Sequence, residues 1–121
     1  NTGIGFVNLI NNANYAGVNT VILQINNAPS SWTGYQYRCV VDGSNTSAFT
    51  LGFTDYWNGS VNNAWENAAN WSCNTIPDAN TDVIINSGTV VVNSAALCRS
   101  IKVNPSSTVT VNTGFKISVT H

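Results

Sequence analysis

One segment, Gly34-Tyr35-Gln36-Tyr37-Arg38-Cys39-Val40-Val41, has the strongest structural pattern in the chain. Large residues at its odd positions alternate with smaller or polar residues, which is the period of a β-strand with one buried face. The runs 20–25 and 47–53 alternate in the same way on either side of it. Asp42-Gly43 is a hairpin signal. We therefore expect strands over 20–25, 35–41 and 47–53, with a tight turn at 42–43.

The composition predicts an extracellular all-β protein. Charged residues make up 7% of the chain, the net charge is −1, and about one residue in six is asparagine. Such a chain has no basic patch for a nucleic acid, and it has no apolar run long enough for membrane insertion. Hydrophobic residues at 43% and four tryptophans exclude a disordered chain. Amides and hydroxyls then provide the solubility.

Three cysteines leave one thiol over in a secreted protein. Cys73 and Cys98 lie in the same half of the chain, so we predict a disulfide between them. The alternative is that both are small buried thiols. Cys39 then pairs outside this chain segment, with another subunit or with a cysteine upstream.

The Tyr37-x-Cys39 spacing is that of a tyrosine corner, in which the ring packs inward and its hydroxyl caps upstream backbone. With the segment 15–25, the segment 34–41 resembles the second half of immunoglobulin-like repeats in large surface proteins of Bacteroidetes-type bacteria. The resemblance implies a partial Ig-like domain over 1–53 with strands C′, E, F and G. Strands A, B and C have no counterpart.

A different pattern begins at residue 54. The motifs Trp57-Asn58-Gly59-Ser60, the segment 65–71 with a tryptophan at each end, and Ile76-Pro77 resemble a Trp/Asn-rich β-module of the same secreted proteins. The second domain then spans 54–121. Short apolar runs follow at 83–85, 89–92, 100–103, 108–111 and 115–119. They suit a small β-sandwich or roll, which we favour because few rungs bury little core, or the start of a β-solenoid.

Half a sandwich leaves its apolar face uncovered. The predicted assembly core consists of Phe6, Leu23, Ile25, Tyr37, Phe49 and Leu51. At about 1.5–3 kcal/mol per large side chain, the lost burial exceeds the stability of a small domain. Three explanations stay open: upstream strands of the parent protein cover this face, the second domain covers it, or another copy of the chain lends strands.

No pattern of catalytic residues is present, and no cofactor is expected. Asp78, Asn80 and Asp82 alternate like the opening of a calcium loop, but the glycine and glutamate of such a loop are missing. The simpler interpretation is a polar loop that caps the next strand. Trp57, Trp65 and Trp71 are candidates for glycan contact if their rings are exposed, and core residues otherwise.

The sequence thus predicts a non-enzymatic structural or adhesive module of an extracellular bacterial surface protein. Its partners would be other copies of the chain or upstream strands, and strand donation between copies would build a filament. The alternative is a glycan-binding accessory module of a secreted protein.

Overall fold

A computed structural model describes residues 5–121, and the chain divides into two units, Asn1–Gly52 and Phe53–His121. The expected domain boundary lies one residue further on. Within the described residues all regular structure is β-strand, apart from the short 3₁₀ turns η1 (Ser30–Trp32) and η2 (Ala68–Asn70). The predicted all-β class is confirmed.

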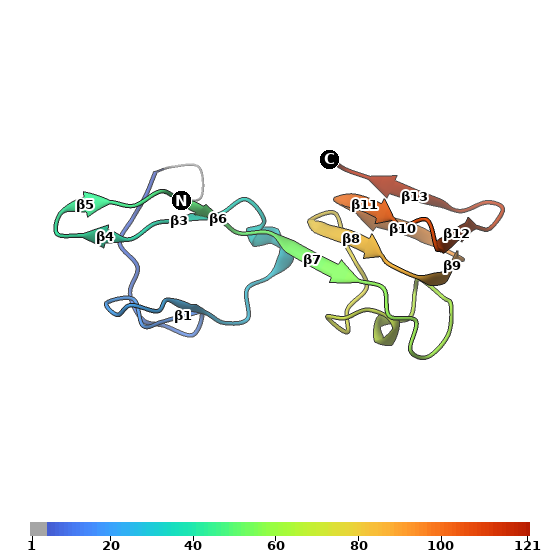
Figure 1. The fold of residues 1–121 in the computed structure, drawn as a ribbon, viewed down its shortest axis with the longest axis horizontal. Helices are drawn as coiled ribbons and strands as arrows, with labels where there is room; N and C mark the ends of the chain where they lie inside the picture. Colours follow the sequence, from blue (N-terminus) through green and yellow to red (C-terminus); the bar gives the residue numbers. More distant parts are fainter. Residues whose placement is uncertain (1–4) are drawn as a thin grey trace. The chain divides into compact units, whose positions relative to one another are not determined.

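The strands described in unit 1, over residues 5–52, have two residues each and pair antiparallel in twos (Figure 1). They are β1 (Tyr15–Ala16) with β2 (Gln24–Ile25), β3 (Gln36–Tyr37) with β6 (Phe49–Thr50), and β4 (Val40–Val41) with β5 (Ser44–Asn45). The predicted turn forms at Asp42 and Gly43, whose φ angles of 48° and 77° are both left-handed. The continuous strand expected over 35–41 is wrong, because β3 and β4 are separated at residues 38–39 and belong to different sheets.

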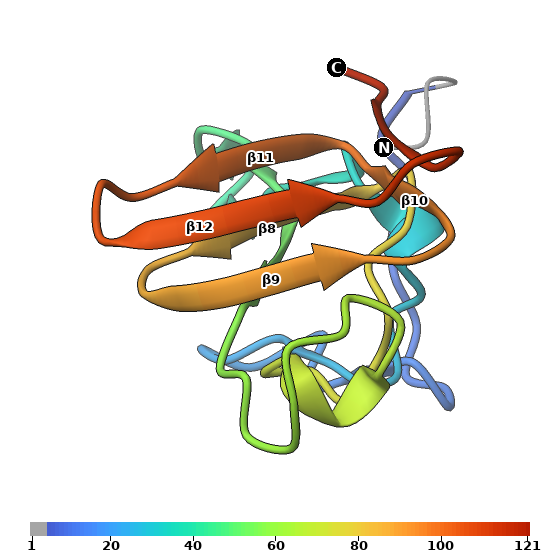
Figure 2. The same ribbon diagram turned by 90° about the vertical axis from the view of Figure 1, so that its right-hand side faces the viewer.

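Unit 2 is built from strands that pair in parallel between successive turns of the chain. They are β7 (Phe53–Tyr56), β8 (Thr81–Ile85), β9 (Gly88–Val92), β10 (Ala95–Cys98), β11 (Ser100–Val103), β12 (Ser107–Val111) and β13 (Lys116–Val119). β8 lies between β7 and β11, β9 pairs with β12, and β10 pairs with β13. One coil, β8–β10, is thus stacked on a second, β11–β13 (Figure 2).

This arrangement is a β-solenoid, so the favoured sandwich or roll is wrong and the alternative is correct. The register pairs Asp82 with Ser100, Thr89 with Thr108 and Ala96 with Ile117. The paired residues are 18, 19 and 21 positions apart, which is the length of one coil on each of the three sides. A meander would pair neighbouring strands antiparallel. Strand β10 was missed in the sequence because Ala-Ala-Leu-Cys has little β-branched character.

The core of unit 2 consists of columns of side chains that point into the coils. In the first coil these are Val83, Ile85, Val90, Val92, Ala96 and Cys98, all buried. Asparagines hydrogen-bond between coils at the corners: Asn104 Nδ2 donates to Asn86 Oδ1 at 3.0 Å. Parallel stacking in register therefore aligns both aliphatic and amide side chains.

One end of this solenoid is covered by the loop from residue 57 to residue 73. Trp71 lies edge-on to Trp57 and to Trp65, with ring centroids 5.0 and 4.8 Å apart, and its Nε1 donates to the Trp65 carbonyl at 2.8 Å. The three rings are at most 6% exposed. The three rings cover the core at the end of the solenoid where β7 is the edge strand of the β11-β8-β7 sheet.

Two buried polar residues hold this covering loop. Asn70 Nδ2 donates to Asn62 Oδ1 and to the Ala64 carbonyl, and its Oδ1 accepts from the amides of Val61 and Asn62, at 2.8–3.1 Å. Every hydrogen-bonding position of that amide is used. Asp55 Oδ1 similarly accepts from Ser72 Oγ at 2.7 Å, which ties the loop to β7.

Candidate functional site

The most unusual surface of the chain is an open cleft in unit 1. No residue from 5 to 52 is buried, and Val7, Val21 and Phe49 are 73%, 101% and 64% exposed. The side chains surround a cleft of about 1040 Å³. Folding normally requires a buried apolar core to offset the loss of chain entropy, and residues 5–52 do not provide one by themselves.

Most of the predicted assembly core gathers at this cleft. Phe6, Leu23, Ile25, Tyr37 and Phe49 all line it, although they come from segments up to 43 residues apart. Leu51 does not; its amide donates to the Tyr35 carbonyl at 2.8 Å instead. None of the six is buried, so this apolar face is uncovered in the single chain.

A cluster of four aromatic side chains lies along one side of the cleft. The Trp32 ring stacks on the Tyr15 and Tyr35 rings, with centroid distances of 5.6 Å to each. The Tyr37 hydroxyl lies 3.2 Å from the Tyr15 hydroxyl, and desolvation followed by this hydrogen bond raises the pKa of Tyr37. The expected tyrosine-corner contact with upstream backbone is therefore wrong, since the Tyr15 side chain occupies that position.

The cleft carries little charge and has free strand edges. Arg38 is the one charged residue among those lining it, and its guanidinium lies over the Phe6 ring, 4.0 Å from the centroid. Each sheet that the structure describes in residues 5–52 has two strands, so β1, β2, β4, β5 and β6 each have an edge with no other described strand. Apolar surface beside open edges is chemically suited to an additional β-strand.

All three cysteines are free thiols, so the predicted Cys73–Cys98 disulfide is wrong. Cys98 points into the solenoid core, where burial and then the charge of Asp82 raise its thiol pKa. Cys73 is exposed on the covering loop, with its sulfur 3.9 Å from the Thr54 carbonyl. Cys39 is exposed and lines the cleft, and its pairing with another chain stays a prediction.

The rings of Trp57, Trp65 and Trp71 are not available to a glycan. They are buried and mutually near-perpendicular, at 73–77° between planes, whereas a sugar needs an accessible ring face. The core interpretation is the correct one for these tryptophans.

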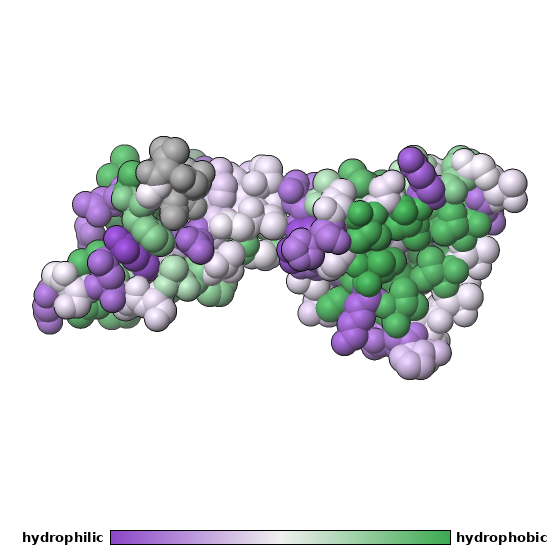
Figure 3. Space-filling model, turned by 90° about the horizontal axis from the view of Figure 1, so that it is seen from above, coloured by the Kyte–Doolittle hydropathy of each residue, from purple (hydrophilic) through white to green (hydrophobic). Residues whose placement is uncertain are grey.

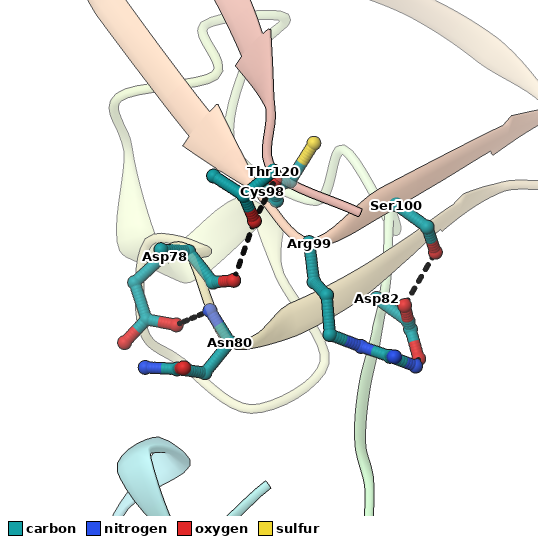
Figure 4. A network of polar contacts seen from close by, with 8 residues as sticks. Asp78, Asn80, Asp82, Cys98, Arg99, Ser100 and Thr120 are labelled. Atoms are coloured by element: carbon teal, nitrogen blue, oxygen red, sulfur yellow. Dashed lines mark hydrogen bonds and ion pairs between the residues drawn. The ribbon is translucent and has the colours of Figure 1, made fainter.

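The segment 78–82 caps a strand, and its acids are held by protein donors (Figure 4). Asp78 Oδ1 accepts from the Asn80 amide and the Thr81 hydroxyl, each at 2.9 Å. Asp82 pairs with Arg99 and Ser100. Because these oxygens already have partners, the weak calcium candidate is not supported. Among residues 5–121, no three acids, cysteines or histidines gather as a metal site.

The cleft of unit 1 can therefore bind an apolar extended segment. Within the described part of the chain, no helix has the length and apolarity to cross a membrane. Sequence reasoning did not identify the roles of Asn70 and Asp55. Nothing in the sequence distinguishes these two from the many other asparagines or from an ordinary surface acid.

Comparison with known proteins gives one family match. A family described as Domain of unknown function (DUF8693) matches residues 56–121, which covers nearly all of unit 2. No curated protein and no solved structure matches the chain.

Proposed function

The chain belongs to the DUF8693 family, and we propose that it is a non-enzymatic structural module of an extracellular bacterial surface protein, whose unit 1 is completed by strands from another copy of the chain. Head-to-tail strand donation of this kind gives a filament, because the contact is heterologous and does not close. Unit 2 supplies a parallel-stacked β-solenoid in the same chain.

The observation that carries the proposal is the uncovered cleft of unit 1. Exposed large apolar residues gather around it, and β1, β2 and β6 beside it have edges with no other described strand. Both features are satisfied together when a strand with alternating apolar residues enters the cleft. The low charge of the chain, 7%, also limits the repulsion between copies.

The test compares the full chain with a variant of the cleft, Phe49→Lys, by sedimentation velocity and negative-stain microscopy. We expect the wild type to form oligomers that grow with concentration. A lysine at position 49, a cleft residue that is 64% exposed, should abolish them. The matched control is Val41→Lys, since Val41 is 55% exposed in the same unit but does not line the cleft.

Oligomers that persist unchanged in Phe49→Lys would contradict the proposal. Cys39 gives a second measurement, because it lines the cleft and its thiol is free. After mild oxidation we expect a disulfide-linked dimer on non-reducing gels that collapses with reductant and is absent in Cys39→Ser.

A further inference from the structure

The covering loop of unit 2 contains the one Asn-Gly pair of the chain, Asn58-Gly59. Asparagine is chemically labile, because the backbone nitrogen of the next residue attacks its side-chain carbonyl carbon. Glycine in the next position leaves that approach free, since it has no Cβ. The Asn58 side chain is also exposed to water. A reactive pair therefore lies in the segment that covers one end of the solenoid core.

The fold of the loop requires glycine at position 59. The φ angle of Gly59 is 56°, in the left-handed region, and a Cβ there would lie 3.0 Å from Trp57 Nε1. Trp57 is 6% exposed and belongs to the core. The side chain of Asn58 has a structural role too, because its Oδ1 accepts from the Ser60 amide at 3.3 Å. The reactive pair is thus part of how the loop packs.

Hydrogen bonds oppose the reaction while the loop is closed. The Gly59 amide donates to the Asn70 carbonyl at 3.2 Å, and the Asn58 amide donates to the same carbonyl at 2.9 Å. The attacking nitrogen must first lose its proton, so the bond from Gly59 has to break. Asn70 is itself fully buried, and its side chain is bonded to residues 61–64. Attack therefore requires the loop to open locally.

We propose that Asn58-Gly59 is a site of spontaneous deamidation that is controlled by opening of the covering loop. The Gly59 nitrogen loses its proton to solvent and bonds to Asn58 Cγ, while the side-chain nitrogen takes a proton from water and leaves as ammonia. Water then opens the cyclic imide. Cleavage of the nitrogen–Cγ bond gives aspartate, and cleavage of the bond to the backbone carbonyl carbon gives isoaspartate. Water is the only other reactant.

The isoaspartate product prevents the loop from closing as before. Its backbone runs through the former side chain of residue 58 and is longer by one carbon atom. Gly59 then cannot keep its close approach to Trp57 and its bond to the Asn70 carbonyl together. Each opening that ends in isoaspartate is therefore irreversible.

Release of the loop uncovers apolar surface. The loop contributes Trp57, Trp65 and Trp71 to the core that also contains Val83. On the side of unit 2 opposite the loop, Val103 is 44% exposed, and hydrophobic side chains form a continuous surface (Figure 3). The isoaspartate form should expose a comparable surface at the loop end, with its tryptophans in contact with water.

The test follows the full chain during incubation in mildly alkaline buffer. Peptide mass spectrometry detects the change from amide to acid, and enzymatic methylation specific for isoaspartate detects the product. We expect the change to accumulate at Asn58 and far more slowly at Asn86 and Asn93, which are exposed but followed by serine. Asn58→Gln keeps an amide but needs a larger ring, so the product should be lost. Isolated isoaspartate protein should show red-shifted tryptophan emission.

Asn70→Ala tests the control by the loop, since it loosens the loop without altering the reactive pair. Deamidation at Asn58 should be faster by about tenfold or more in this variant. The matched control is Asn63→Ala, exposed in the same loop, which should keep the wild-type rate. If Asn70→Ala does not fold, a series of urea concentrations below the unfolding midpoint of the wild type replaces it, and the rate should rise along the series.

Two results would overturn the proposal, each in a different part. If Asn58 stays an amide even in fully unfolding urea, the pair is not a deamidation site. If the rate at Asn58 is the same in wild type, in Asn70→Ala and in urea, the loop does not control the reaction.

Discussion

At the scale of single residues, a few polar side chains determine the conformation of the covering loop. Asn70 is fully buried, and its side-chain amide group bonds to the backbone of Val61, Asn62 and Ala64. Asp55 occupies the position that Val83 occupies in the next layer, and its bond from Ser72 draws the loop over the end of the core. These contacts are why an irregular segment can close a solenoid.

We expect Asn70→Ala to destabilise unit 2 by about 3 kcal/mol, since several buried groups would lose their partners at once. Urea unfolding followed by tryptophan fluorescence measures this. Asn63→Ala is the control, because Asn63 is exposed in the same loop, and it should change stability by less than about 0.5 kcal/mol. Equal midpoints for the two variants would contradict the role given to Asn70.

The ionisation of Asp82 makes the unfolding free energy of unit 2 depend on pH. Burial acts to raise its pKa, but hydrogen bonds from Arg99 and Ser100 outweigh burial and hold the pKa below the ordinary 3.8. The folded state therefore binds this proton less readily than the unfolded state. The stabilisation is complete above the ordinary pKa and is lost as the pH falls through the lowered one.

We expect Asp82→Asn to flatten the fall in unfolding free energy between about pH 5 and pH 3, measured by urea titrations at each pH. Glu66, whose pKa is also lowered, remains in this variant and maintains a smaller slope below its ordinary 4.5. An unchanged slope in Asp82→Asn would show that the pair with Arg99 contributes nothing.

At the scale of elements, each strand of unit 2 gains its stability from the layers above and below it. In the first coil β8 has a strand on both sides, and β9 has β12 on one side and an isolated bridge from Val91 to Ala64 on the other. Each strand of the second coil pairs with one described strand. Valines at register-paired positions of the two coils should therefore differ in how much they contribute to the free energy of unfolding, although both lie in similar apolar runs.

Val92 and Val111 test this directly, because they are register partners on β9 and β12. We expect Val92→Ala to cost about 2 kcal/mol, through lost burial and a cavity, and Val111→Ala to cost less than about 1 kcal/mol. Urea unfolding of dilute protein provides both values. Similar costs would mean that the second coil is already covered.

At the scale of the whole chain, the two units differ in how much of their own structure they can maintain. The buried hydrophobic residues of the described chain all belong to unit 2. Unit 1 has two-residue strands and an open cleft. Local opening is easiest where few apolar contacts are buried.

Hydrogen exchange should therefore separate the units in dilute solution. We expect the amides of residues 5–52 to exchange far faster than those of β8–β13, and to slow when the chain assembles at high concentration. Peptide-level mass spectrometry at two concentrations measures both. Strong protection of residues 5–52 in the dilute sample would show that unit 1 needs no partner strands.

Local pattern alone was sufficient for the all-β class, the turn at Asp42-Gly43 and the short strands after residue 81 other than β10, because alternation and turn residues act over a few positions. The parallel pairing, the free thiols and the burial of Trp57, Trp65 and Trp71 depended on the tertiary structure. The parallel strand pairings join residues from 18 positions apart, as in Asp82 with Ser100, to 28 positions apart, as in Phe53 with Thr81. Strand runs of equal length fit a meander and a solenoid equally well. Only the register between coils, where Val83 meets Ile101 and Val90 meets Val109, distinguishes them.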